Sequence, residues 1–248
     1  MTRWVPVLLA LAFALGTAGT ASADWHESTG LNLSWGDCGA RGWLDQTFAC
    51  DKNVGTAQAV ASFIAPANVD SVTAGSAVID IQQAGVAFLD SWWELQRGGC
   101  RSGGASATWT IFMWNATCTD PWHDTYPNGV TATTFELLGY TLRVRSTVTG
   151  CAGSALVPGD EYFGLYFVVN HLRTVNGYNP CAGCDRTACI AFNELTIFQP
   201  TFQPETWRIG GAPVGGRDFV TWQTADTPDC AAVPVLKRSW GQIKALYR

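Results

Sequence analysis

Three histidines could act as general bases in this chain: His26, His123 and His171. His123 is the most suggestive of them, because it lies in a polar loop directly after an aromatic residue, Trp122. His171 follows an apolar run and is typical of a structural imidazole at the end of a strand. The serine nucleophile pattern Gly-x-Ser-x-Gly does not occur. The sequence therefore does not favour a serine or cysteine hydrolase.

Paired carboxylates are the second chemistry to weigh, because glycoside hydrolysis needs one acid and one base or nucleophile on either side of a sugar. The best placed pair is Glu161 and Glu194, since each lies in a strand-like segment and the two strands could be neighbours. Asp80 and Glu136 come next. Glu161 also fits the entrance of a strand, and Glu194 also fits a position facing solvent. A glycoside hydrolase is therefore the third of three functional hypotheses.

Three thiols stand close together in Cys181-Ala-Gly-Cys184 and Cys189. A redox pair would precede a helix, where the helix terminus lowers the thiol pKa, but a strand-like run follows here. Covalent haem attachment would need histidine where the chain has Asp185, and a zinc site would need a fourth ligand such as His171 or a distant cysteine. Structural disulfides are the favoured interpretation, and we expect no metal and no cofactor.

The sequence contains nine cysteines, an odd number, so at least one is unpaired. Sequence alone leaves many connectivities open. Short-range pairing is the simplest expectation, which predicts the bridges Cys38–Cys50 and Cys100–Cys118. Cys151 and Cys230 are more isolated. The residues we expect in disulfides are Cys38, Cys50, Cys100, Cys118, Cys181, Cys184 and Cys189.

Tryptophan is the strongest positive indication of binding. The chain has twelve tryptophans, and only Trp4 lies within residues 1–23. Flat aromatic faces stack on the apolar faces of sugars, although most tryptophans stabilise cores. Trp109 and Trp114 differ by five positions and would point to opposite faces of one strand. Adjacent tryptophans in a regular segment likewise cannot both face inward. We expect a binding surface to draw on Trp92, Trp93, Trp114, Trp122 and His123.

The candidate residues must be placed in a cellular compartment and on a fold. Residues 1–23 indicate the compartment. They combine an early Arg3, an apolar run and a small-residue exit at Ala21-Ser22-Ala23, which is typical of a secretory signal peptide. No later stretch approaches the length of about 20 apolar residues that a transmembrane helix needs. We expect a secreted protein, extracellular or periplasmic, whose cysteines meet oxidising conditions.

The composition excludes some partners. Acidic residues outnumber basic ones by 20 to 15, for a formal net charge of −5. Nucleic-acid binding needs a net basic face, so we do not expect it. Charged residues are 14% of the chain, against a usual value of about 25%, while hydrophobic residues are 47%. A large core under an uncharged polar surface is typical of an extracellular β-protein.

Strand-like segments recur between glycine, proline and asparagine residues. They cover residues 31–35, 57–64, 76–82, 108–114, 133–148, 161–173, 189–198 and 206–209. The segment 133–148 should turn near Gly139, and 161–173 is apolar on both faces, as in a central covered strand. Helical patterns are limited to 86–96 and 240–247.

The expected fold is all-β: a single antiparallel β-sandwich, jelly-roll-like, stapled by disulfides and closed by a short C-terminal helix. The expected organisation is a signal peptide at 1–23, a sandwich domain at 24–238 and an amphipathic tail at 239–248.

Three segments resemble those of uncharacterised secreted bacterial proteins. They are Leu31-Asn-Leu-Ser-Trp35-Gly-Asp-Cys38, the stretch from Cys181 to Cys189, and the ending Ser239-Trp-Gly-Gln-Ile-Lys-Ala-Leu-Tyr-Arg248. The resemblance implies secretion but no particular activity, and its recurrent tail suggests sorting or surface attachment. A closing helix is the alternative interpretation of that tail.

Taken together, the sequence favours a secreted, non-catalytic binding module for glycan or another extracellular surface polymer. The main alternative is a structural or surface-layer protein without a small ligand. Exposed clustered tryptophans would favour binding, open strand edges would favour self-association, and two facing carboxylates would favour catalysis.

Overall fold

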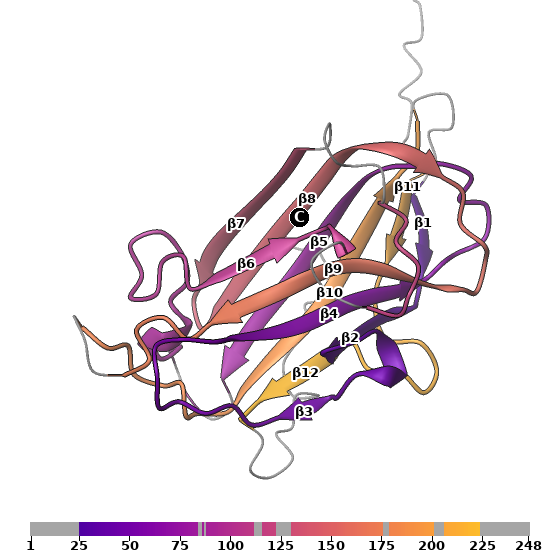
Figure 1. The fold of residues 1–248 in the computed structure, drawn as a ribbon. Helices are drawn as coiled ribbons and strands as arrows, with labels where there is room; N and C mark the ends of the chain where they lie inside the picture. Colours follow the sequence, from indigo (N-terminus) through magenta and orange to yellow (C-terminus); the bar gives the residue numbers. More distant parts are fainter. Residues whose placement is uncertain are drawn as a thin grey trace, which may run out of the picture.

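The computed structural model describes residues 25–83, 86, 88–111, 116–122, 130–175, 179–200 and 206–223. Two β-sheets pack face to face over this part of the chain (Figure 1). The prediction of an all-β sandwich stapled by disulfides is thus confirmed. The expected signal peptide at 1–23 and tail at 239–248 lie outside the described residues, as does the expected closing helix.

The larger sheet has eight strands in the order β1-β11-β10-β5-β8-β7, with β12 paired to β10 and β3 paired to β12. Their bounds are β1 Trp25–Ser28, β3 Asp45–Gln46, β5 Val72–Gln83, β7 Val130–Leu138, β8 Thr141–Ser154, β10 Ala188–Phe198, β11 Thr206–Ile209 and β12 Phe219–Trp222. Two pairs, β1 with β11 and β12 with β3, are parallel, which departs from the purely antiparallel arrangement that we expected.

The smaller sheet has four strands in the order β2-β4-β9-β6. They are β2 Leu31–Trp35, β4 Thr56–Ile64, β6 Ala105–Thr108 and β9 Glu161–Asn170. As the sequence predicted, β9 is a central strand, paired to β4 on one edge and to β6 on the other. The expected turn near Gly139 is the tip of the hairpin that joins β7 to β8.

Two sequence predictions of local structure are wrong. Residues 86–96 do not form an α-helix, because the described part contains only one short 3-10 turn, η2, at Ser91–Trp93. The strand expected at 108–114 instead ends at Thr108 as β6. Strands β1, β3 and β12 were missed, since two to four residues are too few to show an alternating pattern.

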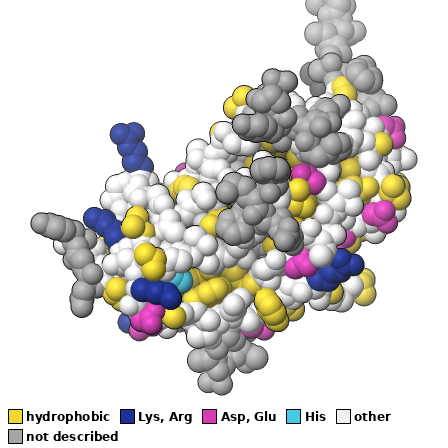
Figure 2. Space-filling view, viewed as in Figure 1, with side chains coloured by type: hydrophobic (Ala, Val, Ile, Leu, Met, Phe, Trp, Pro, Cys, Tyr) yellow, Lys and Arg dark blue, Asp and Glu magenta, His cyan; other side chains and the backbone are white. Residues whose placement is uncertain are grey.

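The core lies between the sheets, where every second residue of each strand points inward. The tryptophans that are essentially fully buried are Trp35, Trp92, Trp93, Trp109, Trp122 and Trp222. On the face seen in Figure 2, charged side chains are scattered among uncharged ones, and hydrophobic side chains gather in a band with a histidine at one end. No helix in the described ranges is long and apolar enough to cross a membrane.

The three bridges with both partners described connect distant parts of the chain. They are Cys38–Cys118, Cys50–Cys184 and Cys100–Cys181, with Cα separations of 6.0, 5.9 and 5.9 Å. The predicted pairs Cys38–Cys50 and Cys100–Cys118 are therefore wrong. After Cys38 the chain leaves the smaller sheet and forms β3 in the larger one, so Cys50 ends near other partners.

The structural role that we expected for these cysteines is confirmed. Cys181 and Cys184 bond to different partners, which removes the redox interpretation of their Cys-x-x-Cys spacing. Cys189 is also disulfide-bonded, while Cys230 lies outside the described residues. Cys151 is a buried free thiol.

Candidate functional site

The tryptophans predicted to form a binding surface do not form one. Trp92, Trp93 and Trp122 have no exposed area, so none of them offers a ring face to a ligand. Trp114 and His123 lie outside the described residues. The prediction of a surface made by these five residues is thus wrong for the three that the structure describes.

Local geometry explains why both Trp92 and Trp93 point inward. They lie in the 3-10 turn η2, where successive side chains do not alternate between two faces as they do in a strand. Their rings meet edge to face with centroids 4.8 Å apart, and Trp92 also lies 4.8 Å from Trp222. Trp122 donates its indole N–H to the carbonyl of Phe163 at 2.9 Å. These rings belong to the core.

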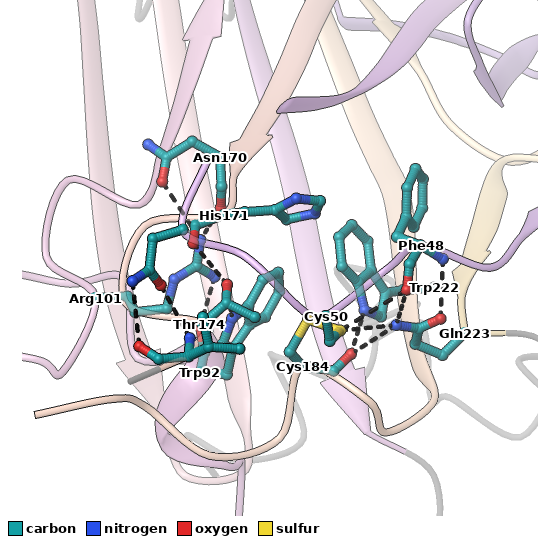
Figure 3. The surroundings of a disulfide bond; sticks show 12 residues. Phe48, Cys50, Trp92, Arg101, Asn170, His171, Thr174, Cys184, Trp222 and Gln223 are labelled. Carbon is teal, nitrogen blue, oxygen red and sulfur yellow. Dashed lines mark hydrogen bonds between the residues drawn. A yellow bond between two sulfur atoms is a disulfide. The ribbon is translucent and has the colours of Figure 1, made fainter. Parts of the chain in front are cut away.

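A buried cation organises the end of the sandwich that holds this cluster (Figure 3). Arg101 is fully buried and lies 3.6 Å from the ring centroid of Trp92. Its guanidinium donates to the carbonyls of Leu172 at 2.8 Å and Trp92 at 2.9 Å, and to the carbonyl of Asn170. Burial lowers the pKa of Arg101 to about 9, so it stays charged at neutral pH. Arg101 joins the η2 segment to the chain after β9.

His171 lies beside this cation, as Figure 3 shows, and has a structural position. Its imidazole is buried, with ring centroids 5.8 Å from Trp222 and 6.4 Å from both Phe48 and Trp92. Burial lowers the pKa of His171, which favours the neutral ring. The structure thus agrees with the sequence interpretation of a structural imidazole.

The predicted carboxylate pair is not assembled. Glu161 begins β9 in the smaller sheet, whereas Glu194 lies in β10 of the larger sheet and forms a salt bridge with Arg208. Asp80 and Glu136 do lie on either side of one residue, Arg143, in the strand register. Arg143 donates to both oxygens of Asp80, at 2.8 and 2.7 Å, so that carboxylate is held in an ion pair.

The described residues do form a pocket, at the place where the two sheets join. The loop between β11 and β12 bonds to the outer edge of β2: Leu31 N–H donates to Gly211 O and Leu33 N–H to Arg217 O, both at 2.9 Å. The pocket beside this loop has a volume of about 380 Å³. Its lining residues are Asn32, Gly39, Ala40, Gly42, Leu44, Glu161, Pro213, Val214, Gly215, Gly216 and Arg217.

Glu161 is the one carboxylate among the residues that line this pocket. Its Oε1 accepts hydrogen bonds from Asn32 Nδ2 at 3.0 Å and from Ser62 Oγ at 2.6 Å. Two donors from neighbouring strands, β2 and β4, thus fix the carboxylate in one orientation. Both donors bond to Oε1, so Oε2 takes part in neither of these hydrogen bonds and is available as an acceptor.

Glycines let the backbone approach these polar groups closely. Gly39 has φ of +45°, and a β-carbon there would lie 2.8 Å from Glu161 Oε2 and closer still to Oε1. A β-carbon on Gly216 would collide with Asn32 Oδ1. Larger residues at either position would fill the space around the two acceptors.

Arg217 fixes the loop at the rim of the pocket. Its guanidinium donates to the carbonyls of Phe219 at 2.9 Å and Leu44 at 2.6 Å, and to Asp45 Oδ1 at 2.6 Å. It also lies 4.4 Å from the ring centroid of Phe219. Because these acceptors occupy the guanidinium, we assign it to holding the loop on β3.

An exposed tryptophan stands between two pocket-lining residues in sequence. Trp43 is 67% exposed and follows Gly42, and its backbone bonds to Trp35 in both directions, at 2.7 and 3.0 Å. The sequence analysis did not select Trp43. Its position in a glycine-containing loop after Cys38 is the signal that could have identified it. Nothing in the sequence indicates that residues 213–217 lie near this loop.

No group of three or more His, Cys, Asp and Glu side chains in the described ranges could hold a metal ion. The arrangement of Glu161, Asn32 and Trp43 instead offers hydrogen-bond acceptors and one exposed aromatic face. Oxygens of this kind can accept hydrogen bonds from uncharged donors such as hydroxyl groups.

Comparison with known proteins gives no family. No family model matches the chain, and no curated protein matches it in sequence.

Among solved structures, the matches are cohesin modules of Acetivibrio cellulolyticus. The second type II cohesin module of the adaptor scaffoldin ScaA is 7% identical, with a TM-score of 0.35, covering 80% of this chain and 98% of that one. The sixth cohesin of scaffoldin B, solved with a Cel5 dockerin, is 9% identical, with a TM-score of 0.30, covering 74% and 99%. Values this low establish neither a shared topology nor a shared function.

Proposed function

We propose that the protein is a secreted, non-catalytic binding module that recognises an extracellular glycan through the pocket between β2 and the loop that joins β11 to β12. The observation that carries the proposal is the fixed carboxylate of Glu161, which two side chains orient and which no second lining carboxylate accompanies. A retaining or inverting glycosidase would need a second carboxyl group across the scissile bond.

The chemistry of the pocket suits a polyhydroxylated ligand. Glu161 and Asn32 present oxygens that accept hydrogen bonds from sugar hydroxyls. Its volume of about 380 Å³ falls in the usual range for ligand pockets. Trp43, which lies between the lining residues Gly42 and Leu44 in sequence, adds an exposed aromatic face. The low fraction of charged residues in the chain, 14%, favours a neutral polymer over a charged one.

The disulfides support secretion, because bridges of this kind persist in oxidising compartments. The signal peptide predicted at 1–23 and the resemblance to secreted bacterial proteins belong to the same proposal. The tail at 239–248 would then act in sorting or surface attachment.

Depletion from solution by a panel of insoluble polysaccharides and cell-wall material tests the proposal, with salt present to suppress charge effects. We expect one polymer to deplete the protein selectively, and expect Glu161→Gln and Trp43→Ala each to weaken depletion. Phe88→Ala is the matched control, because Phe88 is 78% exposed and does not line the pocket. Failure of every polymer to deplete the protein, or equal effects of all three substitutions, would contradict the proposal.

A further inference from the structure

Strand β7 is the long open edge of the described structure. It forms the last strand of the larger sheet and pairs only with β8 among the described residues, as its outermost position in Figure 1 shows. The other edges differ: β1 and β6 have four residues each, β3 has two, and the edge of β2 is bonded by the loop at Gly211 and Arg217. Among the described strands, β7 is therefore the longest edge whose outward backbone groups, on alternate residues, pair with no other described strand.

The sequence of β7 lacks the features with which proteins protect such an edge. Natural edge strands are kept apart by lysine, proline, bulges or short length. Residues 130–138 contain no lysine and no proline, and their register with β8 is continuous over all nine pairs. Glu136 is the one charged residue in the strand. The apolar residues Val130 and Leu138 are 66% and 39% exposed at its two ends.

The strand is complementary to itself. In an antiparallel pair of two copies centred on Thr134, Val130 of one copy lies opposite Leu138 of the other, so exposed apolar side chains meet at both ends. In the same register Glu136 lies opposite Ala132 and never opposite its own copy. A two-fold axis through Thr134 therefore pairs all nine residues of one copy with residues of the other, and no like charges lie opposite each other.

We propose that β7 is a self-association edge, through which two copies of this chain pair antiparallel and join their larger sheets into one continuous sheet. The occupant is a second copy, because the apolar ends match only in this self-paired register. The inference goes beyond glycan binding, since β7 contributes no residue to the pocket.

The test is sedimentation of the mature protein over a range of concentrations, with charges introduced at the two-fold centre. Wild type should form a concentration-dependent dimer. Thr134→Lys and Thr134→Glu should each weaken it at least about fivefold, because like charges then lie directly opposite one another. An equimolar mixture of the two variants should restore the dimer, which also shows that both variants are folded. Val157→Lys is the matched control and should leave the dimer unchanged, because Val157 is 57% exposed and lies outside both β7 and β8.

A protein that stays monomeric at every concentration overturns the proposal. A dimer that withstands both Thr134 substitutions, or a mixture of the two variants that fails to restore it, overturns it as well. Loss of polysaccharide depletion with an intact dimer contradicts only the proposed glycan function, so the two failures are distinguishable.

Discussion

A β-carbon on Gly39 would collide with the carboxylate of Glu161, so any other residue at this position of the turn η1, Gly39–Arg41, would displace that carboxylate in the pocket. Gly39 and Glu161, which are 122 positions apart in the chain, therefore pack against each other at the pocket.

Gly39→Ala should displace the Glu161 carboxylate and abolish polysaccharide depletion. The positive φ of Gly39 should also destabilise the variant by about 1–2 kcal/mol. Gly103→Ala is the control, because Gly103 has φ of +82° and nothing within 4 Å of the added carbon. Urea unfolding should show a loss of stability for both variants, larger for Gly39→Ala because of the collision, while depletion should fall only for Gly39→Ala. Equal depletion by both variants would argue against a binding role for this contact.

Peptide mapping of the native protein without reduction should recover Cys38–Cys118, Cys50–Cys184 and Cys100–Cys181. Replacing Cys50 and Cys184 together by alanine should lower the free energy of unfolding by about 2–5 kcal/mol. The same double replacement measured under reducing conditions supplies the control, since the difference from reduced wild type should then largely vanish. Recovery of Cys38–Cys50 would show that the bridges are local after all.

Cys151 should resist alkylation in the folded protein. Burial raises the pKa of its thiol to about 11, and the reactive species is the thiolate. Iodoacetamide at neutral pH should leave Cys151 unmodified until denaturant is added, as mass spectrometry of the peptide can show. Rapid modification under native conditions would mean that this thiol is accessible.

Arg101→Met should destabilise the protein by about 3 kcal/mol or more, because several buried carbonyls would lose their donor. Arg97→Met is a matched control on the same loop, since Arg97 is exposed. Urea denaturation at neutral pH compares the two variants. A small effect of Arg101→Met would show that water or neighbouring groups satisfy these carbonyls.

Acidification should destabilise the protein partly through His171. Burial lowers the pKa of its imidazole in the folded state, aided by the charges of Arg101 and Lys52 and opposed by the Val54 backbone and Asp51. The unfolded chain therefore binds the proton more readily, so this contribution is complete above a pH of about 6.5 and is lost as the pH falls toward the folded-state pKa. Unfolding free energies of wild type and His171→Gln should converge as the pH falls across this range. Parallel curves would exclude His171 as their cause.

The sequence predicted the central strands well because their patterns are local. The apolar residues on both faces of β9 indicated a covered strand, and Gly139 marked the hairpin between β7 and β8. Disulfide partners could not be found in this way, because Cys50 and Cys184 meet only after strands distant in sequence have paired.

The site was harder to predict than the fold. Glu161 was identified as a carboxylate of interest, but its donor Asn32 and the loop around Gly216 lie more than 50 residues away on either side. Trp92 and Trp93 were assigned to a surface because a regular segment exposes one of two neighbours, whereas the 3-10 turn buries both. Tryptophan type alone does not separate core from surface.

A crystal structure of the mature protein with an oligosaccharide of the polymer that depletes it tests the central claim most directly. The account predicts a sugar in the pocket, with hydroxyl groups within hydrogen-bond distance of Glu161 and Asn32 and a ring near Trp43. A sugar bound elsewhere on the sandwich, with this pocket empty, would contradict it.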